Sequence, residues 1–596
     1  MCSKLLNDQK NYFCAANKDF SGSNKIGNYY FKGLFIDKKK IVFAKKGYVL
    51  GYSDEELIKN IKKKGFEFIK NLKGQFFIIY YDIEEDEFHF GNDCFGRETL
   101  FYYTDKKDFI ISNDFWQIIN LVNPDISNID MISVKEFILF GFSLFENTII
   151  KHLKILPPAS LVKINNDYIM NITNYFDRIF GDYENLTIDE AVEKVDAIID
   201  DYFKEFKENN KPDTVYGVGL SGGLDSRLLP YYAKNNAMKL KAYMIADKRS
   251  KGLFESMNVK LAKKTAKYYN LNLNIIEQKS ETFENKMFYD VRYAPCIPSQ
   301  VPICVRSKVS DVDILITGTC GYGIGLEGDC EEIKNTSKEE FKNKMIENFI
   351  QSKNPHIISN LFNDTKNIDN IDKISKFIEE NNEKTNLQIF LKLKHFLINS
   401  KNRYGTYESL NGYLADFPIY LSLLNTVTYR YPYELIERRP ILLNLINKKK
   451  GIPSLKKIPS TKLTEFPLIH SDQEYTNMFK EANNKSFFQN VLKLFKIQSQ
   501  KPRPWEFLRF LFFAIQEHIL RGNGDWNREK SNKTYKNEMY KTLLNPNSYL
   551  NNIFQSKTII SHFEKGRIDS KSFLQIVKIK RILDLIESKN YKKFFD

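Results

Sequence analysis

The sequence lacks the cysteine and histidine patterns that mark metal sites or disulfide scaffolds. Its seven cysteines form no C-x-x-C pair, and its seven histidines are scattered without H-E-x-x-H or comparable ligand spacing. An odd number of dispersed cysteines favours free thiols in a reducing cytoplasm over a disulfide framework. The histidine spacing disfavours a zinc site.

Long hydrophobic runs are also missing. The N-terminus has no apolar segment of the kind that signal peptides carry. The most apolar stretch in the first third, residues 137–150, is short and contains Glu146. Its length predicts a buried element rather than a membrane span. These absences predict a cytoplasmic protein without a membrane-spanning segment.

The composition is that of a folded protein of several domains. Hydrophobic residues make up 42% of the 596 residues, with 47 Phe and 34 Tyr, which excludes a disordered chain. A chain of this length predicts two to four domains. The net charge of +15 is mild for such a length, and many lysines stand in short clusters. Solvated surface explains these clusters better than a nucleic-acid partner does.

The first 165 residues read mainly as strands. Four short runs rich in β-formers or alternating in polarity predict antiparallel hairpins, and residues 55–70 have helical spacing. Pro157 and Pro158 then interrupt the chain, and a further strand follows. The predicted strands are residues 75–81, 86–90, 100–103, 109–112 and 161–164.

From Thr187 the pattern changes to helices and strands in alternation. Thr187 and Glu190 have the spacing of a capping box that opens a helix over residues 187–207. The alternation after it is typical of a doubly wound parallel sheet. Predicted strands are residues 215–220, 240–245, 273–276 and 314–317, and predicted helices are 225–235 and 255–269.

The junction between the first of these strands and its helix carries the most specific motif, Ser-Gly-Gly-Leu-Asp-Ser at residues 221–226. Consecutive glycines let the backbone approach an anion closely. The N–H groups that open the following helix point at that anion. Ser221 and Ser226 add hydroxyl donors, and Asp225 can hold Mg²⁺ that bridges phosphate oxygens. A Walker loop is excluded because Gly-Lys-Ser/Thr is absent.

This motif resembles the pyrophosphate loop of N-type ATP pyrophosphatases, and the wider chain is similar to asparagine synthetase-like proteins. Residues 72–82 and 92–97 resemble the late strands of a class II glutamine amidotransferase domain. Residues 148–158 resemble the connector to the synthetase domain. The dipeptides Asn402-Arg403 and Phe417-Pro418 are similar to a later helical region. The resemblance spans about residues 60–470.

The resemblance implies an α+β N-terminal domain with an antiparallel Ntn-like sheet, then an α/β adenine nucleotide hydrolase-like domain with a helical C-terminal part. The corresponding boundaries are a degenerate amidotransferase-like domain over 1–165, an ATP pyrophosphatase domain over 185–530, and a helical tail of unassigned role over 531–596. The implied activity is amide formation: ATP adenylates a carboxylate, pyrophosphate leaves, and an amine displaces AMP. The implied cofactor is Mg²⁺, held by Asp225.

The implied partners are a small-molecule or peptide carboxylate and an amine or ammonia donor, without nucleic acid; a homodimer is compatible with the resemblance. A specialised carboxylate is favoured over aspartate. ATP and pyrophosphate are expected to contact a set of eight residues. These are Leu220, Ser221, Gly222, Gly223, Asp225, Ser226, Arg227 and Gly318.

Cys2 stands where the family has its glutaminase nucleophile, with its own α-amine as base once Met1 is removed. Residues 3–8 do not form the apolar strand expected behind it, and the usual glutamine-holding segments are not visible. The sequence therefore favours a nitrogen source other than glutamine, either free ammonia or a substrate amine. Some relatives use the latter to close lactams or peptide macrocycles.

A second departure lies after the strand at residues 314–317. The family motif there supplies another metal-binding carboxylate, but this chain has Tyr322 at the matching position. A phenol is a poor ligand for Mg²⁺, although Glu327 and Asp329 follow closely. Further on, Lys456, Lys457 and Lys462 lie where relatives offer a lysine to the acyl-phosphate. Lys457 is the predicted catalytic residue, beside Asp225 and Cys2.

Three alternatives remain open at this point. Asparagine synthetase proper, using glutamine through Cys2, is one. A non-catalytic homologue that keeps the fold is another, because Tyr322 replaces a metal ligand. An RNA-modifying enzyme with the same loop is the third. The positive charge favours that reading, whereas the amidotransferase-like half and the lack of paired cysteines oppose it.

Overall fold

The computed structural model describes most of the first half of the chain and separate segments of the second. The described ranges are 13–247, 257–278, 311–317, 336–349, 370–403, 413–416, 440–458, 533–544, 556–565 and 570–594, with short gaps inside some of them and a few single residues between them.

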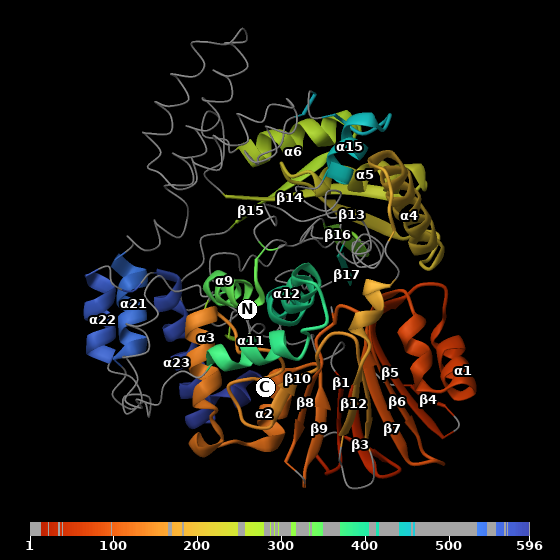
Figure 1. The fold of residues 1–596 in the computed structure, drawn as a ribbon. Helices are drawn as coiled ribbons and strands as arrows, with labels where there is room; N and C mark the ends of the chain where they lie inside the picture. Colours follow the sequence, from red (N-terminus) through yellow and green to blue (C-terminus); the bar gives the residue numbers. More distant parts are fainter. Residues whose placement is uncertain are drawn as a thin grey trace.

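Two six-stranded antiparallel sheets form the N-terminal region, in the lower part of Figure 1. One sheet has the order β10-β8-β9-β1-β3-β2, and the other has the order β12-β11-β7-β6-β5-β4. The strands are β1 (Phe13–Ala16), β2 (Asn24–Ile26), β3 (Tyr29–Gly33), β4 (Ile36–Lys38), β5 (Ile41–Val49), β6 (Gly74–Asp82), β7 (Glu87–Asn92), β8 (Phe101–Thr104), β9 (Phe109–Ser112), β10 (Leu153–Ile155), β11 (Ser160–Ile164) and β12 (Met170–Asn174).

The core between these sheets follows the two-residue period of strands. On β6, Phe77, Ile79 and Tyr81 face the partner sheet, whereas Ile78 and Tyr80 belong to the larger cluster on the outer side. The inner layer is mainly aromatic and β-branched, and large buried rings contribute most of its apolar area. All five strands predicted in this region are confirmed. The sequence did not predict β1 to β5, β10 or β12.

One predicted element is wrong in its extent. Residues 55–70 were expected to form a single helix, but α1 (Asp54–Lys64) ends at Gly65. Gly65 has a φ of 78°, in the left-handed region that glycine enters without strain. A 3₁₀ helix, η3 (Phe66–Asn71), continues from it. The glycine therefore divides the segment.

The apolar stretch over residues 137–150 is buried, as predicted. It starts inside α3 (Met131–Phe140), which ends at Gly141, and its remaining apolar side chains pack into the same core. Within the part of the chain that the structure describes, no helix has the length and apolar character needed to cross a bilayer.

A five-stranded parallel sheet lies above the N-terminal sheets in Figure 1. Its order is β15-β14-β13-β16-β17. After β13 the chain adds β14 and β15 on one side of it, and then β16 and β17 on the other. Four of these strands are predicted by the sequence, and β17 is not. The strands are β13 (Val215–Gly219), β14 (Lys239–Asp247), β15 (Leu273–Gln278), β16 (Ile314–Thr317) and β17 (Tyr413–Asp416).

Helices cover one face of this sheet. The predicted helix at 225–235 is confirmed as α5 (Asp225–Asn235), and α6 (Met257–Tyr268) follows β14. α5 contacts β13, β14 and β16, whereas α6 contacts β14 and β15. Val218 and Ile316 belong to the large core cluster that includes residues of both helices. The opposite face carries a small cluster of Tyr243, Val312 and Leu315. The parallel sheet is therefore confirmed, and the doubly wound arrangement with helices on both faces stays a prediction.

The helical region expected after residue 335 is present in the described segments. It contains α9 (Lys338–Phe349), α11 (Asn370–Glu379), α12 (Asn386–Arg403) and α15 (Pro440–Lys448). The tail beyond residue 531 is also helical, as predicted, with α21 (Lys533–Leu543), α22 (Ser556–Glu564), α23 (Ser570–Glu587) and the 3₁₀ helix η9 (Asn590–Phe594).

This tail packs against the N-terminal region, which gives it a structural role that the sequence did not reveal (Figure 1). α23 lies along α3, and the Lys578 ammonium is 5.8 Å from the ring centroid of Phe137. Tyr591 in η9 stacks on Trp116 of α2 (Phe115–Val122), with ring centroids 6.0 Å apart. The C-terminal helices thus complete the core of the first region.

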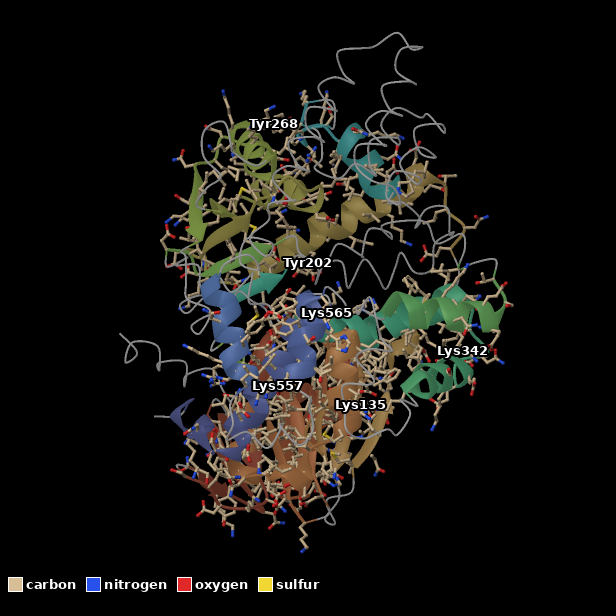
Figure 2. The ribbon with its side chains drawn as sticks, turned by 90° about the vertical axis from the view of Figure 1, so that its left-hand side faces the viewer. Lys135, Tyr202, Tyr268, Lys342, Lys557 and Lys565 are labelled. Carbon is tan, nitrogen blue, oxygen red and sulfur yellow. The ribbon has the colours of Figure 1, made fainter. Side chains whose placement is uncertain are left out.

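Direct contacts also join the N-terminal sheets to the parallel-sheet region. The hydroxyl groups of Tyr48 on β5 and Tyr202 on α4 (Ile188–Glu208) are hydrogen-bonded in a buried position. Figure 2 shows Tyr202 where the upper and lower regions meet. Arg292 makes a bidentate ion pair with Asp114, at 2.7 and 3.0 Å. Planar pairs of this kind fix orientation as well as distance.

The predicted capping box of α4 provides a stability test. The Thr187 hydroxyl accepts from the Glu190 amide at 3.3 Å, and the Thr187 amide donates to the Glu190 carboxylate at 2.8 Å. Thr187→Ala removes one half of this exchange and is expected to lower the free energy of unfolding by about 1 kcal/mol. Urea denaturation measures the loss. Thr187→Ser keeps the acceptor and should stay near wild type, and equal losses in both variants would contradict the capping role.

Candidate functional site

The Ser-Gly-Gly motif lies where the sequence predicts it, between the end of β13 and the start of α5. β13 is hydrogen-bonded to β14 on one edge and to β16 on the other. The change in strand order falls between β13 and β16. In open parallel sheets, ligands bind beyond the carboxyl ends of the strands at such a point. The motif therefore occupies the position in this sheet where a ligand is expected.

Hydrogen bonds between the two serines hold the loop. The Ser221 and Ser226 hydroxyl groups are 2.8 Å apart, and the Ser221 amide donates to the Ser226 oxygen at 3.1 Å. The Gly223 amide donates to the Ser221 oxygen at 3.1 Å. Ser226 is buried and Ser221 is half-buried. The pair thus ties the end of the strand to the first turn of the helix.

The expected close approach of the loop glycines to an anion stays a prediction, and their backbone conformation is ordinary. Neither Gly222 nor Gly223 has a positive φ, so a sharp backbone bend does not require them. A Cβ on Gly223 would lie 3.2 Å from the Ser221 oxygen, which is tighter than an ordinary contact. The missing side chain keeps the loop compact around its hydroxyl pair.

Asn258 is a part of this site that the sequence analysis missed. It stands in the first turn of α6, and its side-chain oxygen accepts from the Gly222 amide at 2.5 Å. The Asn258 side-chain oxygen thus accepts the Gly222 N–H, a donor that an anionic oxygen could also accept. No motif marks Asn258, because it reaches the loop from the next crossover, 36 residues away.

The loop has the donor set of an anion site. Leu224 is the N-cap of α5 and offers no side-chain acceptor to the first turn. The amides at that helix end therefore lack the cap that most helices have, and the helix dipole favours negative charge there. Asp225 occupies the same turn and is half-buried. These groups fit a phosphate chain that brings a cation with it.

A metal cage built from protein side chains is not found in the described ranges, where no three His, Cys, Asp or Glu side chains cluster closely enough to hold an ion. Mg²⁺ does not need such a cage, because it keeps several waters and is usually held by one or two carboxylates and substrate phosphates. Asp225 is the carboxylate that the loop itself supplies.

Arg227, predicted to contact phosphate, lies in the first turn of α5 and has other partners. It is 1% exposed, and its Nη1 donates to the carbonyl oxygens of Pro453 at 3.3 Å and Ile458 at 2.6 Å. The guanidinium group thus contacts a distant chain segment, and its predicted contact with phosphate stays a prediction. Its buried Nε has no hydrogen-bond partner among the described residues, so the contacts with these two carbonyl groups are made through Nη1.

Lys457 lies on that same distant segment, one residue before Ile458. Its side chain is exposed, and its ammonium lies 5.5 Å from the ring centroid of Tyr268 at the end of α6. Figure 2 shows Tyr268 at the top of the molecule. The fold brings the backbone of Lys457 close to α5, although 231 residues separate Arg227 from Ile458. The catalytic role of Lys457 stays a prediction.

Several predicted residues lie outside the described residues. They are Cys2, Gly318, Tyr322, Glu327, Asp329, Lys456, Lys462 and the dipeptide Phe417-Pro418. The dipeptide Asn402-Arg403 falls at the end of α12.

A different cysteine occupies the first described strand. Cys14 on β1 is fully buried, and its side chain belongs to the cluster outside the two-sheet core. Burial raises the pKa of its thiol, and the charge of Asp114 raises it further. A thiol kept protonated is a poor nucleophile. Cys14 is therefore a packing residue.

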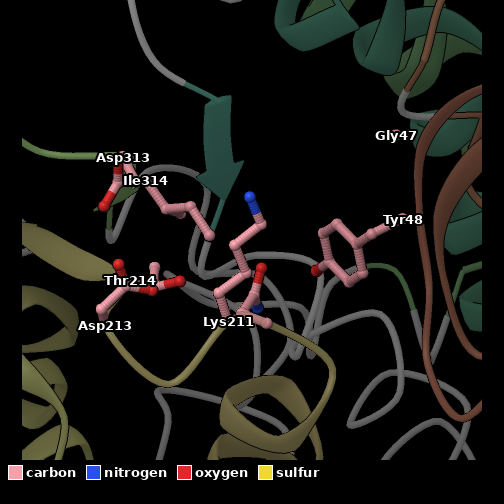
Figure 3. Close-up of a pocket in the computed structure, with 8 residues that line it drawn as sticks. Gly47, Tyr48, Lys211, Asp213, Thr214, Asp313 and Ile314 are labelled. Carbon is pink, nitrogen blue, oxygen red and sulfur yellow. The ribbon is translucent and has the colours of Figure 1, made fainter.

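A pocket of about 470 Å³ lies at the other end of the parallel sheet (Figure 3). Thr214 and Asp313 line it directly before β13 and β16 begin, and Tyr48 lines it from β5. Five strand residues, about 16 Å, separate this edge from the Ser-Gly-Gly loop. The pocket is therefore distinct from the candidate site.

The two-sheet region can now be compared with known proteins. Residues 39–176 match the family model of the glutamine amidotransferase domain. This match covers β5 to β12 and confirms the amidotransferase-like N-terminal region. It covers less than half of the chain, so it assigns this region alone. No protein with a curated description matches the sequence.

Two solved structures were also found to be similar. One is glutamine phosphoribosylpyrophosphate (PRPP) amidotransferase from B. subtilis complexed with ADP and GMP, with 10% identity and a TM-score of 0.20, over 46% of this chain and 77% of that one. The other is the allosteric regulatory enzyme of purine biosynthesis, with 8% identity and a TM-score of 0.20, over 57% and 83%. Scores this low carry no argument about the whole chain.

The burial of Cys14 predicts its reactivity. In the native protein we expect iodoacetamide to modify Cys14 roughly 100-fold or more slowly than in urea, because the thiolate forms only when β1 opens. Mass spectrometry of peptides after timed labelling gives both rates. Similar rates in the two conditions would show that Cys14 is accessible in the folded chain.

Proposed function

We propose that the chain is an ATP-dependent, AMP-forming ligase that joins a carboxylate to an amine. The observation that carries this proposal is the hydroxyl-bonded Ser221–Ser226 loop at the carboxyl end of β13, where the order of the parallel strands changes. The resemblance of the loop to the pyrophosphate loop of N-type ATP pyrophosphatases supports the choice of nucleotide. The amidotransferase match of residues 39–176 supports amide chemistry.

The chemistry assigns a task to each group of the loop. Activation of a carboxylate at the α-phosphorus expels pyrophosphate, whose negative charge needs donors that are already in place. The Ser221 and Ser226 hydroxyl groups and the uncapped amides of α5 are such donors. Mg²⁺ held by Asp225 would neutralise part of the same charge. The amine then attacks the activated carbonyl carbon, and AMP leaves.

The nitrogen donor separates two versions of this function. The family match favours glutamine, since it assigns residues 39–176 to a domain type that takes nitrogen from glutamine. The residues after Cys2 favour a substrate amine or ammonia, because they do not form the apolar strand expected behind a glutaminase nucleophile. We propose the substrate amine or ammonia as the donor and keep glutamine as the second candidate.

Asp225 tests the ligase proposal. Wild-type protein with ATP, Mg²⁺ and a panel of carboxylates should exchange labelled pyrophosphate into ATP with at least one of them. Asp225→Ala should lower this rate by about 100-fold, because the carboxylate that would hold Mg²⁺ beside the charge of the leaving pyrophosphate is lost. Asp201→Ala is the matched control: Asp201 is exposed on α4, and the rate should not change. Equal rates in wild type and Asp225→Ala would refute the role of the loop.

Cys2 tests the nitrogen donor. With the carboxylate that supports exchange, product formation should proceed with ammonia or a substrate amine, and Cys2→Ala should leave it unchanged. Product analysis by mass spectrometry, with each nitrogen source supplied alone, makes the comparison. Turnover with glutamine that Cys2→Ala abolishes, while turnover with ammonia persists, would establish the second candidate instead.

A further inference from the structure

The Arg227 guanidinium group lies next to the loop, and the proposed chemistry does not use it. It stands two residues after Asp225 in the first turn of α5 and is almost fully buried. A buried cation without partners is costly. Among the described residues, two partners of its side chain are backbone carbonyl groups of a segment far along the chain.

That segment, called the strap, comprises the described residues 451–454 and 457–458. Arg227 Nη1 donates to two of its carbonyl groups, those of Pro453 and Ile458. The Ile458 side chain is buried against Leu261 of α6. Because one guanidinium nitrogen contacts both described parts of the strap, at Pro453 and Ile458, it holds the strap as a closed turn against α5.

The strap also packs closely against Tyr231 of α5, in a contact that does not involve Arg227. Gly451 has a φ of 95°, and a Cβ at this position would lie 2.7 Å from Tyr231 Cε2. Only glycine combines this backbone conformation with this approach. The Lys457 and Ile458 amides both donate to the Ser454 carbonyl, at 3.0 and 2.9 Å, and close the turn internally.

The residues that precede the strap and the residue that holds it have partners of their own. α15 ends at Lys448, shortly before the strap, and Lys448 and Lys449 form ion pairs with Asp189 and Asp196 of α4. On the other side, the Tyr269 hydroxyl donates to the Arg227 carbonyl at 3.1 Å. Burial raises the pKa of Tyr269, so the hydroxyl keeps its proton for this bond. Arg227 is thus held by its backbone and holds the strap by its side chain.

We infer that Arg227 is a positioning residue that couples the Ser221–Ser226 loop to the strap. The inference rests on the proposed function, and it goes beyond it by assigning a task to a residue that the sequence placed on phosphate. Arg227 fixes the position of the Lys457 backbone relative to Asp225. The predicted catalytic lysine therefore keeps a constant position relative to the loop. Losing the guanidinium group would release the strap while leaving the loop hydroxyl pair intact.

Two measurements test this inference, and neither depends on the other. Hydrogen exchange monitored by mass spectrometry follows the Lys457 and Ile458 amides in the full chain. Pyrophosphate–ATP exchange gives kcat and the KM for ATP. The variants are Arg227→Met, which removes the donors, and Arg227→Lys, which keeps a cation but loses the forked geometry. Asn236→Ala is the matched control, since Asn236 caps the far end of α5.

We expect the two strap amides to exchange at least about tenfold faster in Arg227→Met, because their turn is no longer held. The kcat should fall by about 100-fold, as for a misplaced catalytic frame, while the KM for ATP stays within about twofold because the loop is intact. Arg227→Lys should give intermediate values. Asn236→Ala should change neither quantity.

Gly451→Ala should displace the strap from Tyr231 without changing the loop or Arg227. It should therefore cause the same fall in kcat and leave the KM for ATP unchanged. The double variant with Arg227→Met should be no worse than the single one, since both release one element. If Arg227→Met does not fold, Arg227→Lys and Gly451→Ala carry the test.

The outcomes separate this inference from the proposed function. The positioning role would be overturned if the hydrogen-exchange rates of the strap amides did not change in Arg227→Met and Gly451→Ala. It would also be overturned by a raised KM for ATP with kcat unchanged, a result that would indicate that Arg227 contacts the phosphates of ATP. If wild type shows no pyrophosphate exchange with any carboxylate, the proposed function fails. Faster hydrogen exchange of the strap amides in Arg227→Met would then still show that Arg227 holds the strap against α5.

Discussion

Hydrogen bonding along both edges of β13 is the constraint on which the candidate site depends. Because β14 and β16 occupy its two edges, this strand cannot shift without breaking two ladders. Its last residues are fixed further by the Leu220 amide, which donates to the Tyr243 carbonyl at 2.8 Å. Gly217 makes this packing possible, since a Cβ there would lie 2.9 Å from Leu315 Cδ1. The loop that follows therefore starts from a rigid point.

The loop and the strap show two ways in which a fold places chemical groups. The loop groups are neighbours in sequence, and local hydrogen bonds between Ser221 and Ser226 hold them, with one further bond to Asn258. The strap comes from more than 220 residues away and needs a long-range clamp. A long buried arginine suits that purpose, because its planar head offers several donors at fixed angles.

The same distinction explains what the sequence could predict. The boundaries of α5, the capping box of α4 and the strands of the parallel sheet next to the motif were correct, because period, caps and turns are local signals. Gly65 was missed as a break, although it alone divides the predicted helix. Asn258, the carbonyl partners of Arg227 and the pairing of β17 were out of reach, because each depends on chain crossovers that no local pattern encodes. The predicted phosphate contact of Arg227 stays a prediction: the sequence shows that Arg227 follows the loop, but not that its side chain contacts the Pro453 and Ile458 carbonyl groups.

The C-terminal helices have a consequence for how the molecule is made. α3 is complete at residue 140, and α23, which packs along it, begins at residue 570. About 430 residues must be synthesised between these two surfaces, which takes roughly 20 to 90 s at 5–20 residues per second. Throughout that time the part of α3 that α23 contacts lacks this partner. The N-terminal region is therefore made before the helix that completes its packing, and a chain that stops short of α23 leaves this part of α3 uncovered.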